Sequence, residues 1–330
     1  MKNQELYPLL FKPVLKDYIW GGRHLNTLLK RPLPSGDIAE SWEIAGHEDG
    51  TTVVVNGRFA GLSLTKLHQQ LGLDLIGTNN SWAQERGKFP LLIKILDANR
   101  PLSVQVHPND EYALEHEGNE LGKTEMWVVL HAKPNAKVIL GVKKGTTPAA
   151  FRQAIADSKL EPFLHYVTVK TGDVVCVPAG SLHAIMDGLL IAEIQQNSNT
   201  TYRVYDWNRL QDGKPRPLHV DRAMDVINFE QVEPTLSQPK LMSEANGIKR
   251  YQLCANGYFV TERVEMEAGA VFNGRCNGDS LQIWGVIEGN VTVEDVALTA
   301  VQFTLLPAAL GNFSITAKTN AVPLHSYVKE

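Results

Sequence analysis

Residues 172–183 read GDVVCVPAGSLH and combine a strand-like run, a turn and a histidine. Gly172 opens an apolar run that has the character of a strand. Pro178 and Gly180 then predict a turn, because a central strand would not tolerate a missing backbone donor there. His183 follows the turn and is expected to begin the next strand with its side chain pointing inward.

Other short strand-like runs lie on both sides of this turn. They are rich in β-branched and aliphatic residues, and turn pairs such as Asn56-Gly57 and Asp187-Gly188 separate them. The predicted strands are residues 51–55, 89–96, 102–106, 126–130, 137–140, 165–169, 173–177 and 190–195. This close spacing of short strands favours a sandwich or a barrel.

Helical patterns are fewer and short. They cover residues 63–71, 110–117 and 148–158, the last with Thr147 as the N-cap and proline at the first helical position. A further helix is predicted within residues 220–230, and a connector follows it. Residues 278–296 predict a hairpin that turns at residues 288–290.

The chain is therefore expected to be mainly β, with a few short helices and two domains. We predict a catalytic, metal-binding domain with an N-terminal extension over residues 1–230, and a second barrel without a metal site over residues 231–330. At roughly 150 residues per domain, the length of 330 residues agrees with two domains.

Composition and charge exclude several classes of protein. Hydrophobic residues make up 43% of the sequence and the formal net charge is −4, with no cluster of Lys and Arg. These values argue against disorder and against binding to nucleic acid or an anionic membrane surface. Residues 1–20 lack the pattern of a secretion signal, and no run of about 18 apolar residues occurs. We expect a cytoplasmic protein that binds neither nucleic acid nor membrane.

A polar face on one predicted strand is the first candidate site. Successive side chains of a strand alternate between its faces, so Ser103, Gln105 and His107 share one face. This triplet is either the solvated side of an edge strand or part of a site. The nearby segment 122–127, GKTEMW, adds Lys123 and Glu125.

Several long segments together resemble the type I mannose-6-phosphate isomerases of the cupin superfamily. The resemblance covers most of the first 210 residues, and the 76-residue separation of His107 from His183 is similar to the compact bacterial form. It implies two cupin-like β-barrels of the jelly-roll type. The segments that carry it are FKPVLKDYIWGG, PLLIKILDANRPLSVQVHPND, GKTEMW, VPAGSLHAI and NSNTTYRVYDWNR.

The resemblance implies one zinc ion per chain, with Gln105, His107, Glu125 and His183 as its ligands. Imidazole nitrogen and carboxylate oxygen are suitable ligands for Zn²⁺. A neutral amide oxygen is an uncommon one. Without the family pattern, two histidines and a carboxylate would favour Fe²⁺ or Mn²⁺.

The activity implied by the resemblance is the interconversion of mannose 6-phosphate and fructose 6-phosphate, through a cis-enediol. Transfer of a proton between C2 and C1 requires a base. The candidates are Glu193, Lys123 and a metal-bound water. Glu193 is preferred, because apolar neighbours in its strand would raise its pKa. The alternatives are a solvent-facing charge at a strand edge for Glu193 and a surface lysine for Lys123.

Arg203 matches the active-site arginine of the family. A guanidinium is not a base at neutral pH, but its planar fork can hold a phosphate or an enediolate. Ser103 and Lys123 are the other predicted substrate contacts, and Arg100 is a candidate second contact for the anion.

Two other functions remain open from the sequence. An iron-dependent cupin oxygenase would use a redox metal, and a sugar-binding cupin without turnover would keep the pocket alone. The expected partner is a sugar phosphate, and the expected assembly is a monomer or a homodimer.

Overall fold

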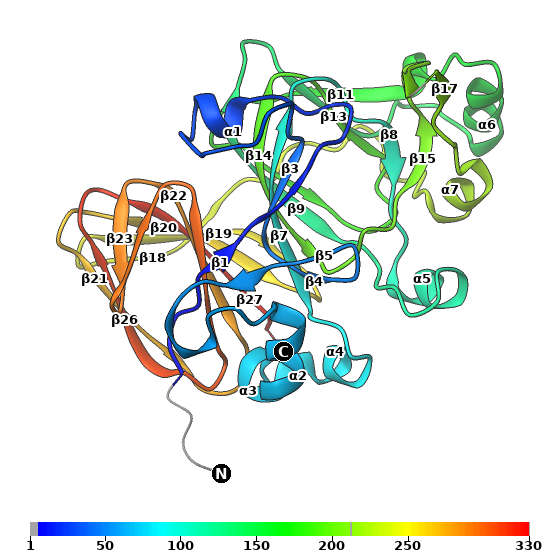
Figure 1. Cartoon of the computed structure of the whole chain (residues 1–330). Coiled ribbons are helices and arrows are strands. Elements are labelled where there is room, and N and C mark those ends of the chain that lie inside the picture. The colour runs from blue at the N-terminus through cyan, green and yellow to red at the C-terminus, as the bar shows by residue number, and fades with distance from the viewer. Residues whose placement is uncertain (1–5, 212, 330) are drawn as a thin grey trace. The chain divides into compact units, whose positions relative to one another are not determined.

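The computed structural model describes residues 6–211 and 213–329, and the prediction of a mainly β protein with short helices is confirmed (Figure 1). The chain forms two compact units. Of the described residues, the site unit contains 15–41 and 94–237, and the second unit contains 6–14, 42–93 and 238–329. The predicted boundary between a metal-binding domain over residues 1–230 and a second barrel over residues 231–330 stays a prediction.

Two larger sheets build the site unit, and strands of one of them continue into the second unit. The five-stranded sheet has the order β11 (Leu164–Thr168), β10 (Lys137–Val142), β13 (His183–Ile185), β8 (Val104–Val106) and β15 (Tyr202–Tyr205). The six-stranded sheet has the order β12 (Val174–Val177), β9 (Glu125–Ala132), β14 (Leu189–Gln196), β7 (Leu91–Ala98), β3 (Glu40–Ile44) and β2 (Val14–Lys16). A boundary between the two units falls within β2, within β3 and within β7.

The alternation of side chains sorts these strands between two cores. Val138 and Leu140 of β10 pack with Trp127 of β9 in one core, which takes residues from both sheets. Ile139 and Val104 pack instead in a second core with residues of α6 (Pro148–Ala156) and α7 (Val220–Val226). These two helices lie beside β15 in Figure 1. The five-stranded sheet therefore has a helix-covered face and a face turned toward the six-stranded sheet.

The second unit contains two larger sheets and two small pairs, β1 (Phe11–Lys12) with β6 (Val53–Val54) and β4 (Gly46–His47) with β5 (Gly50–Thr51). The six-stranded one has the order β18 (Lys240–Ala245), β19 (Ile248–Ala255), β20 (Val260–Met266), β27 (Val322–Tyr327), β22 (Gln282–Glu288) and β25 (Gln302–Leu306). The four-stranded one has the order β21 (Val271–Cys276), β26 (Gly311–Ala317), β23 (Asn290–Val293) and β24 (Val296–Thr299). Apolar residues of both sheets, such as Trp284 and Phe313, share one core.

The hairpin predicted over residues 278–296 is wrong. β22 pairs with β25 and β27, whereas β23 pairs with β24 and β26. Gly289, with φ of +75°, marks the point where the chain crosses from one sheet to the other. Trp284 of β22 and Val291 of β23 pack in the same core from different sheets. The apolar residues of both strands are therefore buried although β22 and β23 do not pair with each other.

The predicted helices are confirmed, and a few short ones were not predicted. Thr147 caps α6, because its hydroxyl accepts a hydrogen bond from the Ala150 amide at 3.2 Å. The remaining helices are α1 (His24–Thr27), α2 (Leu64–Leu71), α3 (Leu73–Ile76), α4 (Ser81–Glu85) and α5 (Asp110–His116), with 3₁₀ turns at Gly57–Phe59, Thr78–Asn80 and Glu161–Phe163. The remaining strands are β16 (Leu210–Gln211) and β17 (Lys214–Pro215).

Within the described ranges, none of the helices has the length and apolar character needed to span a membrane.

Candidate active site

The turn at residues 178–180 brings two candidate ligands together. Gly180 has φ of +84°, which a residue with a side chain rarely adopts. Its amide donates a hydrogen bond to the His107 carbonyl at 2.9 Å. His183 then begins β13 and pairs with Gln105 of β8. The sequence pattern around Gly180 thus fixes the position of His183 against the strand that carries the other candidates.

The polar face of β8 is buried, so the reading as the solvated side of an edge strand is wrong. β8 lies between β13 and β15 in the five-stranded sheet. Val104 and Val106 pack in the helix-covered core, which turns Gln105 toward the other face. The flanking residues Ser103 and His107 are 3% and 1% exposed.

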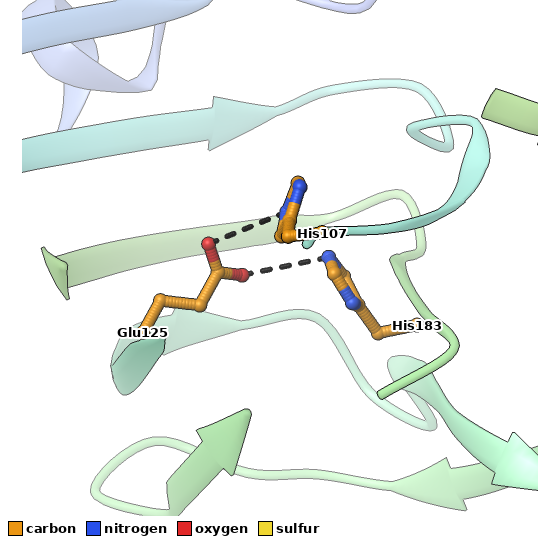
Figure 2. A group of neighbouring side chains, drawn as sticks. All are labelled: His107, Glu125 and His183. Atoms are coloured by element: carbon orange, nitrogen blue, oxygen red, sulfur yellow. Dashed lines mark ion pairs between the residues drawn. The ribbon is translucent and has the colours of Figure 1, made fainter. Parts of the chain in front are cut away.

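Two histidines and a carboxylate converge on one point, as Figure 2 shows. Nε2 of His107 lies 3.5 Å from Oε2 of Glu125, and Nε2 of His183 lies 3.5 Å from Oε1 of the same carboxylate. All three residues are buried, and each comes from a different segment of the fold. Across the residues that the structure describes, this is the one group of His, Cys, Asp or Glu side chains with the spacing of a metal site.

The hydrogen bonds of the two imidazoles prepare them to bind a cation. Nδ1 of His107 donates to the Thr200 carbonyl at 2.8 Å, and Nδ1 of His183 donates to the Ser181 carbonyl at 2.9 Å. Both Nε2 lone pairs are therefore directed toward Glu125. Burial lowers the pKa of His183 to about 4 and lowers the pKa of His107 well below its usual value, so both rings are neutral at pH 7.

The donor set fits a divalent metal. Oε2 of Glu125 is buried and accepts no hydrogen bond with good geometry, although Nζ of Lys123 lies 2.8 Å away. Two neutral imidazole nitrogens and a carboxylate are ligands that Zn²⁺ and Fe²⁺ share. The arrangement identifies a candidate metal centre but not its metal.

Gln105 lies beside this group and links it to the rest of the cavity. Its Nε2 is 3.3 Å from Nε2 of His183, and its Oε1 accepts a hydrogen bond from the Ser103 hydroxyl at 3.3 Å. The same hydroxyl accepts a hydrogen bond from Nε of Arg203 at 3.1 Å. A chain of contacts thus runs from His183 through Gln105 and Ser103 to Arg203.

Lys123 is not a surface residue. It is 5% exposed, and its Nζ lies 3.0 Å from Nε2 of His107 as well as close to Glu125. Its amide donates to the Pro108 carbonyl at 2.9 Å, which ties the start of β9 to the segment after His107. The reading of Lys123 as an exposed lysine is therefore wrong.

Glu193 is likewise buried rather than at a strand edge. It is 3% exposed and belongs to β14, which lies between β9 and β7. The indole N–H of Trp127 is shared between Oε2 of Glu193 and Oε1 of Glu125, both at 3.1 Å. Burial raises the pKa of Glu193 and the nearby charge of Glu125 raises it further, as expected for a desolvated carboxyl group.

These groups meet in a cavity of about 290 Å³. Ser103, Gln105, Lys123, Glu125, Glu193 and Arg203 all line it, together with Tyr18, Trp20, Trp127 and others. Arg100 does not line it; its side chain is exposed. The structure thus brings the predicted catalytic and substrate-binding residues together around the metal candidates.

Residues 9–120 match the family model of the catalytic domain of type I phosphomannose isomerase. Mannose-6-phosphate isomerase of Streptococcus mutans is 36% identical over 322 residues, which cover 97% of this chain and 98% of that protein. The chain belongs to the mannose-6-phosphate isomerase family. The resemblance stated from the sequence motifs is therefore confirmed.

Two further matches agree with membership of the mannose-6-phosphate isomerase family. Mannose-6-phosphate isomerase ManA of Bacillus subtilis is 43% identical over 229 residues, which cover 68% of this chain and 69% of that protein. The crystal structure of mannose 6-phosphate isomerase from Bacillus subtilis superposes with a TM-score of 0.86 at 32% identity, and covers 97% of this chain and 99% of that one. The likeness thus extends over both compact units.

Sequence reasoning missed three charged residues that line the cavity, Glu40, Lys94 and Arg216. Nζ of Lys94 lies 3.5 Å from Oε1 of Glu193 and 3.5 Å from Oε2 of Glu40. Burial works to lower the pKa of Lys94, but Glu40 and Glu193 raise it overall, so it stays charged. A lysine inside the apolar run PLLIKIL was the available signal, since buried lysines are rare without a partner.

Proposed function

We propose that this chain is a zinc-dependent mannose-6-phosphate isomerase that interconverts mannose 6-phosphate and fructose 6-phosphate. The observation that carries the proposal is the convergence of His107 and His183 on Glu125, which lines the cavity together with Glu193 and Arg203. Family membership and the names of the relatives support the same substrate pair.

His107, Glu125 and His183 would hold the zinc ion, with Gln105 as a fourth ligand. Rotating the Gln105 amide by half a turn exchanges its Oε1 and Nε2, and so directs the oxygen toward His183. Zinc bound there supplies a Lewis acid that stabilises negative charge on the substrate's carbonyl and hydroxyl oxygens. Lys123 adds a second positive charge next to Glu125.

Glu193 is the proposed base that moves the proton between C2 and C1. A carboxylate with a raised pKa accepts a carbon-bound proton better than an exposed one and returns it to the neighbouring carbon. Trp127 and Lys94 both contact this carboxylate, which holds it in place. Transfer of the C2 proton of the aldose to Glu193 leaves a cis-enediolate. Delivery of that proton to C1, together with transfer of the O2 hydroxyl proton to O1, gives the ketose.

The remaining polar groups bind and orient the sugar phosphate. The buried ammonium of Lys123 donates a hydrogen bond to a substrate oxygen beside the reacting carbons. The Arg203 guanidinium holds the phosphate, helped by the Ser103 hydroxyl that it contacts. These assignments divide the cavity into a reacting end and an anion-binding end.

The test is a coupled assay with mannose 6-phosphate before chelation, after chelation and after zinc is added back. We expect fructose 6-phosphate to form, its formation to stop on chelation, and zinc to restore it. Turnover that survives complete metal removal contradicts the zinc proposal, and no fructose 6-phosphate from the metal-loaded protein contradicts the isomerase. Oxygen consumption with Fe²⁺ would instead support an iron oxygenase.

His183→Ala gives a matched test of the metal ligands. We expect this variant to lose bound zinc and activity together, with activity reduced by about 100-fold or more. His165→Ala is the control, because His165 is on β11 and does not line the cavity.

A cytoplasmic location and a monomeric or homodimeric state stay predictions.

A further inference from the structure

The cavity has ends of different charge. Glu40, Glu125 and Glu193 lie at the end that contains the metal candidates, where Lys94 and Lys123 pair with them. Arg203 and Arg216 line the other part, and both side chains are partly exposed. Carboxylates repel a phosphate, so the arginine end is the place where a dianionic group is best accommodated.

Arg203 is an arginine without an acidic partner. Its Nε donates to the Ser103 hydroxyl and its Nη1 to the Pro217 carbonyl at 3.1 Å, and both acceptors are neutral. Among residues 6–211 and 213–329, its guanidinium makes no ion pair, and its Nη2 group has no hydrogen-bond partner. Burial lowers the pKa of Arg203, the charges of Arg216 and Arg209 lower it further, and Asp206 raises it. Arg203 and Arg216 line the same cavity.

Arg216 is held by Asp206 in a geometry that leaves donors free. Its Nε donates to Oδ2 of Asp206 at 2.7 Å and its Nη2 to Oδ1, so the two groups form a bidentate pair. Asp206 is 6% exposed and comes directly after β15. The Nη1 group of Arg216 has no partner within the described ranges, and it belongs to a side chain that lines the cavity.

Arg209 shares the same carboxylate but has a different role. Its Nη2 donates to Asp206, its Nη1 to the Pro101 carbonyl at 2.6 Å and its Nε to the Asp206 carbonyl at 3.3 Å. All three of its nitrogens are therefore engaged, and Arg209 does not line the cavity. It anchors the β16–β17 hairpin to the segment before Ser103.

We propose that Arg216, positioned by Asp206, is a second phosphate-binding arginine that acts together with Arg203. This inference rests on the proposed function, because it assigns the phosphate of that substrate to a pair of guanidinium groups. One buried carboxylate shared among neighbouring guanidinium groups leaves net positive charge for the incoming anion. The two arginines favour phosphorylated sugars over neutral ones. A phosphate compensates the positive charge of the two guanidinium groups, whereas a neutral sugar has no anionic group that could do so.

The direct test measures inorganic phosphate binding to the metal-loaded protein by titration calorimetry, beside KM and kcat for mannose 6-phosphate. For Arg216→Gln we expect phosphate affinity to fall and KM to rise on the order of tenfold or more, with kcat within about threefold of wild type. Arg216→Lys keeps the charge without the planar fork, and we expect an intermediate loss.

Arg209→Gln is the matched control, because it removes one positive charge from the same hairpin and the same carboxylate. We expect its phosphate affinity and KM to stay within about threefold of wild type. Equal phosphate affinity in wild type and Arg216→Gln overturns the inference, as does an equal loss in both variants. If Arg216→Gln does not fold, Arg216→Lys decides the matter by the same comparison.

Asp206→Asn tests the positioning role. The amide keeps the size of the side chain but loses the charge that orients Arg216, so we expect KM to rise while kcat is kept. A fall in kcat with unchanged KM overturns the positioning role. Because phosphate binding is measured without turnover, a wild-type protein that binds phosphate through Arg216 but does not isomerise mannose 6-phosphate contradicts the proposed function alone.

Discussion

At the scale of single residues, the indole of Trp127 links two carboxylates with different proposed tasks. Glu125 is a proposed metal ligand and Glu193 is the proposed base, and the Trp127 indole N–H donates to both. The shared donor fixes the separation of the two groups. Removing it leaves two buried carboxylate oxygens each short of a hydrogen bond, which costs about 1–3 kcal/mol for each group.

Trp127→Phe is expected to weaken zinc binding by about 10–100-fold, because outer partners of metal ligands tune affinity by this amount. Phenylalanine keeps much of the buried apolar volume. The measurement is competition with a fluorescent zinc chelator. Trp284→Phe is the control, since the Trp284 indole donates to Gln282 in the second unit. Unchanged zinc affinity in Trp127→Phe would show that its indole does not orient Glu125.

Glu193→Gln is expected to lower kcat by about 100-fold or more, the usual contribution of a general base. Glutamine still accepts the Trp127 hydrogen bond, so KM and zinc content are expected to stay close to wild type. Steady-state kinetics and metal analysis measure these quantities. Glu111→Gln, at an exposed position in α5, is the control. Near-normal turnover in Glu193→Gln would place the base elsewhere, with Lys123 the next candidate.

The residues of the candidate site differ in how far the sequence reveals them. Glu125 and His183 lie in motifs whose local pattern identifies them. Arg216 follows Arg203 by 13 positions and comes directly after β17, the second strand of a small hairpin, and no local pattern joins the two arginines. Lys94 stands out in the sequence as a lysine inside an apolar run, but its partners Glu40 and Glu193 come from strands distant in sequence.

At the scale of elements, the start of β9 depends on close backbone contact. A Cβ on Gly122 would lie 2.5 Å from the carbonyl carbon of Asn109. Asn109 caps α5 through its side chain, which accepts from the Tyr112 amide at 2.9 Å. The absence of a side chain at Gly122 therefore lets Lys123 and Glu125 approach the segment after His107.

Gly122→Ala is expected to lower the free energy of unfolding by about 1–3 kcal/mol, the usual cost of forcing extra volume into a packed site. It also displaces Lys123 and Glu125, so kcat is expected to fall in folded protein. Urea denaturation and steady-state kinetics are the measurements. At Gly257 a Cβ meets no atom within 4 Å, so Gly257→Ala is the control. Equal stability and activity in both variants would contradict the packing argument.

Element types were easier to predict than pairing. The apolar alternation and caps identify strands such as β9 and the helix α6 correctly. The turn between β22 and β23 has the residues of a hairpin, yet these strands enter different sheets. The local sequence indicates where the chain turns. Which strands pair in a sheet depends also on strands such as β27, which come later in the chain.

At the scale of the whole molecule, the second unit contains a buried histidine that the proposed chemistry does not use. His325 stacks on Trp284 with ring centroids 4.1 Å apart, and its Nε2 donates to Gln282 at 2.9 Å. Burial lowers the pKa of His325 to about 3, and the charge of Arg250 contributes. The His325 ring is thus neutral in the folded protein over most of the pH range.

This histidine is expected to make the protein sensitive to acid. In the unfolded chain His325 binds a proton below its usual pKa of 6.5, whereas in the folded chain it does so only near 3. Stability is therefore full above pH 6.5 and is lost as the pH falls toward 3. Between pH 7 and pH 5, protonation of His325 in the unfolded chain lowers the free energy of unfolding by about 2 kcal/mol.

The measurement is urea denaturation at both pH values. His325→Phe keeps an aromatic ring against Trp284 and does not titrate, so its pH-dependent loss is expected to be smaller by about that amount. His165→Phe, at a partly exposed position, is the control and is expected to behave as wild type. An identical loss in wild type and His325→Phe would contradict the role of this ring.

The division of β2, β3 and β7 between the two units has a consequence for synthesis on the ribosome. Residues 42–93 leave the ribosome before the site unit is complete, yet their compact unit also needs residues 238–329, which are made after it. The site unit, through residue 237, is complete before them. During that interval apolar residues such as Leu64 and Leu67 lack the rest of their unit, so the nascent chain carries surface that invites chaperone binding or aggregation.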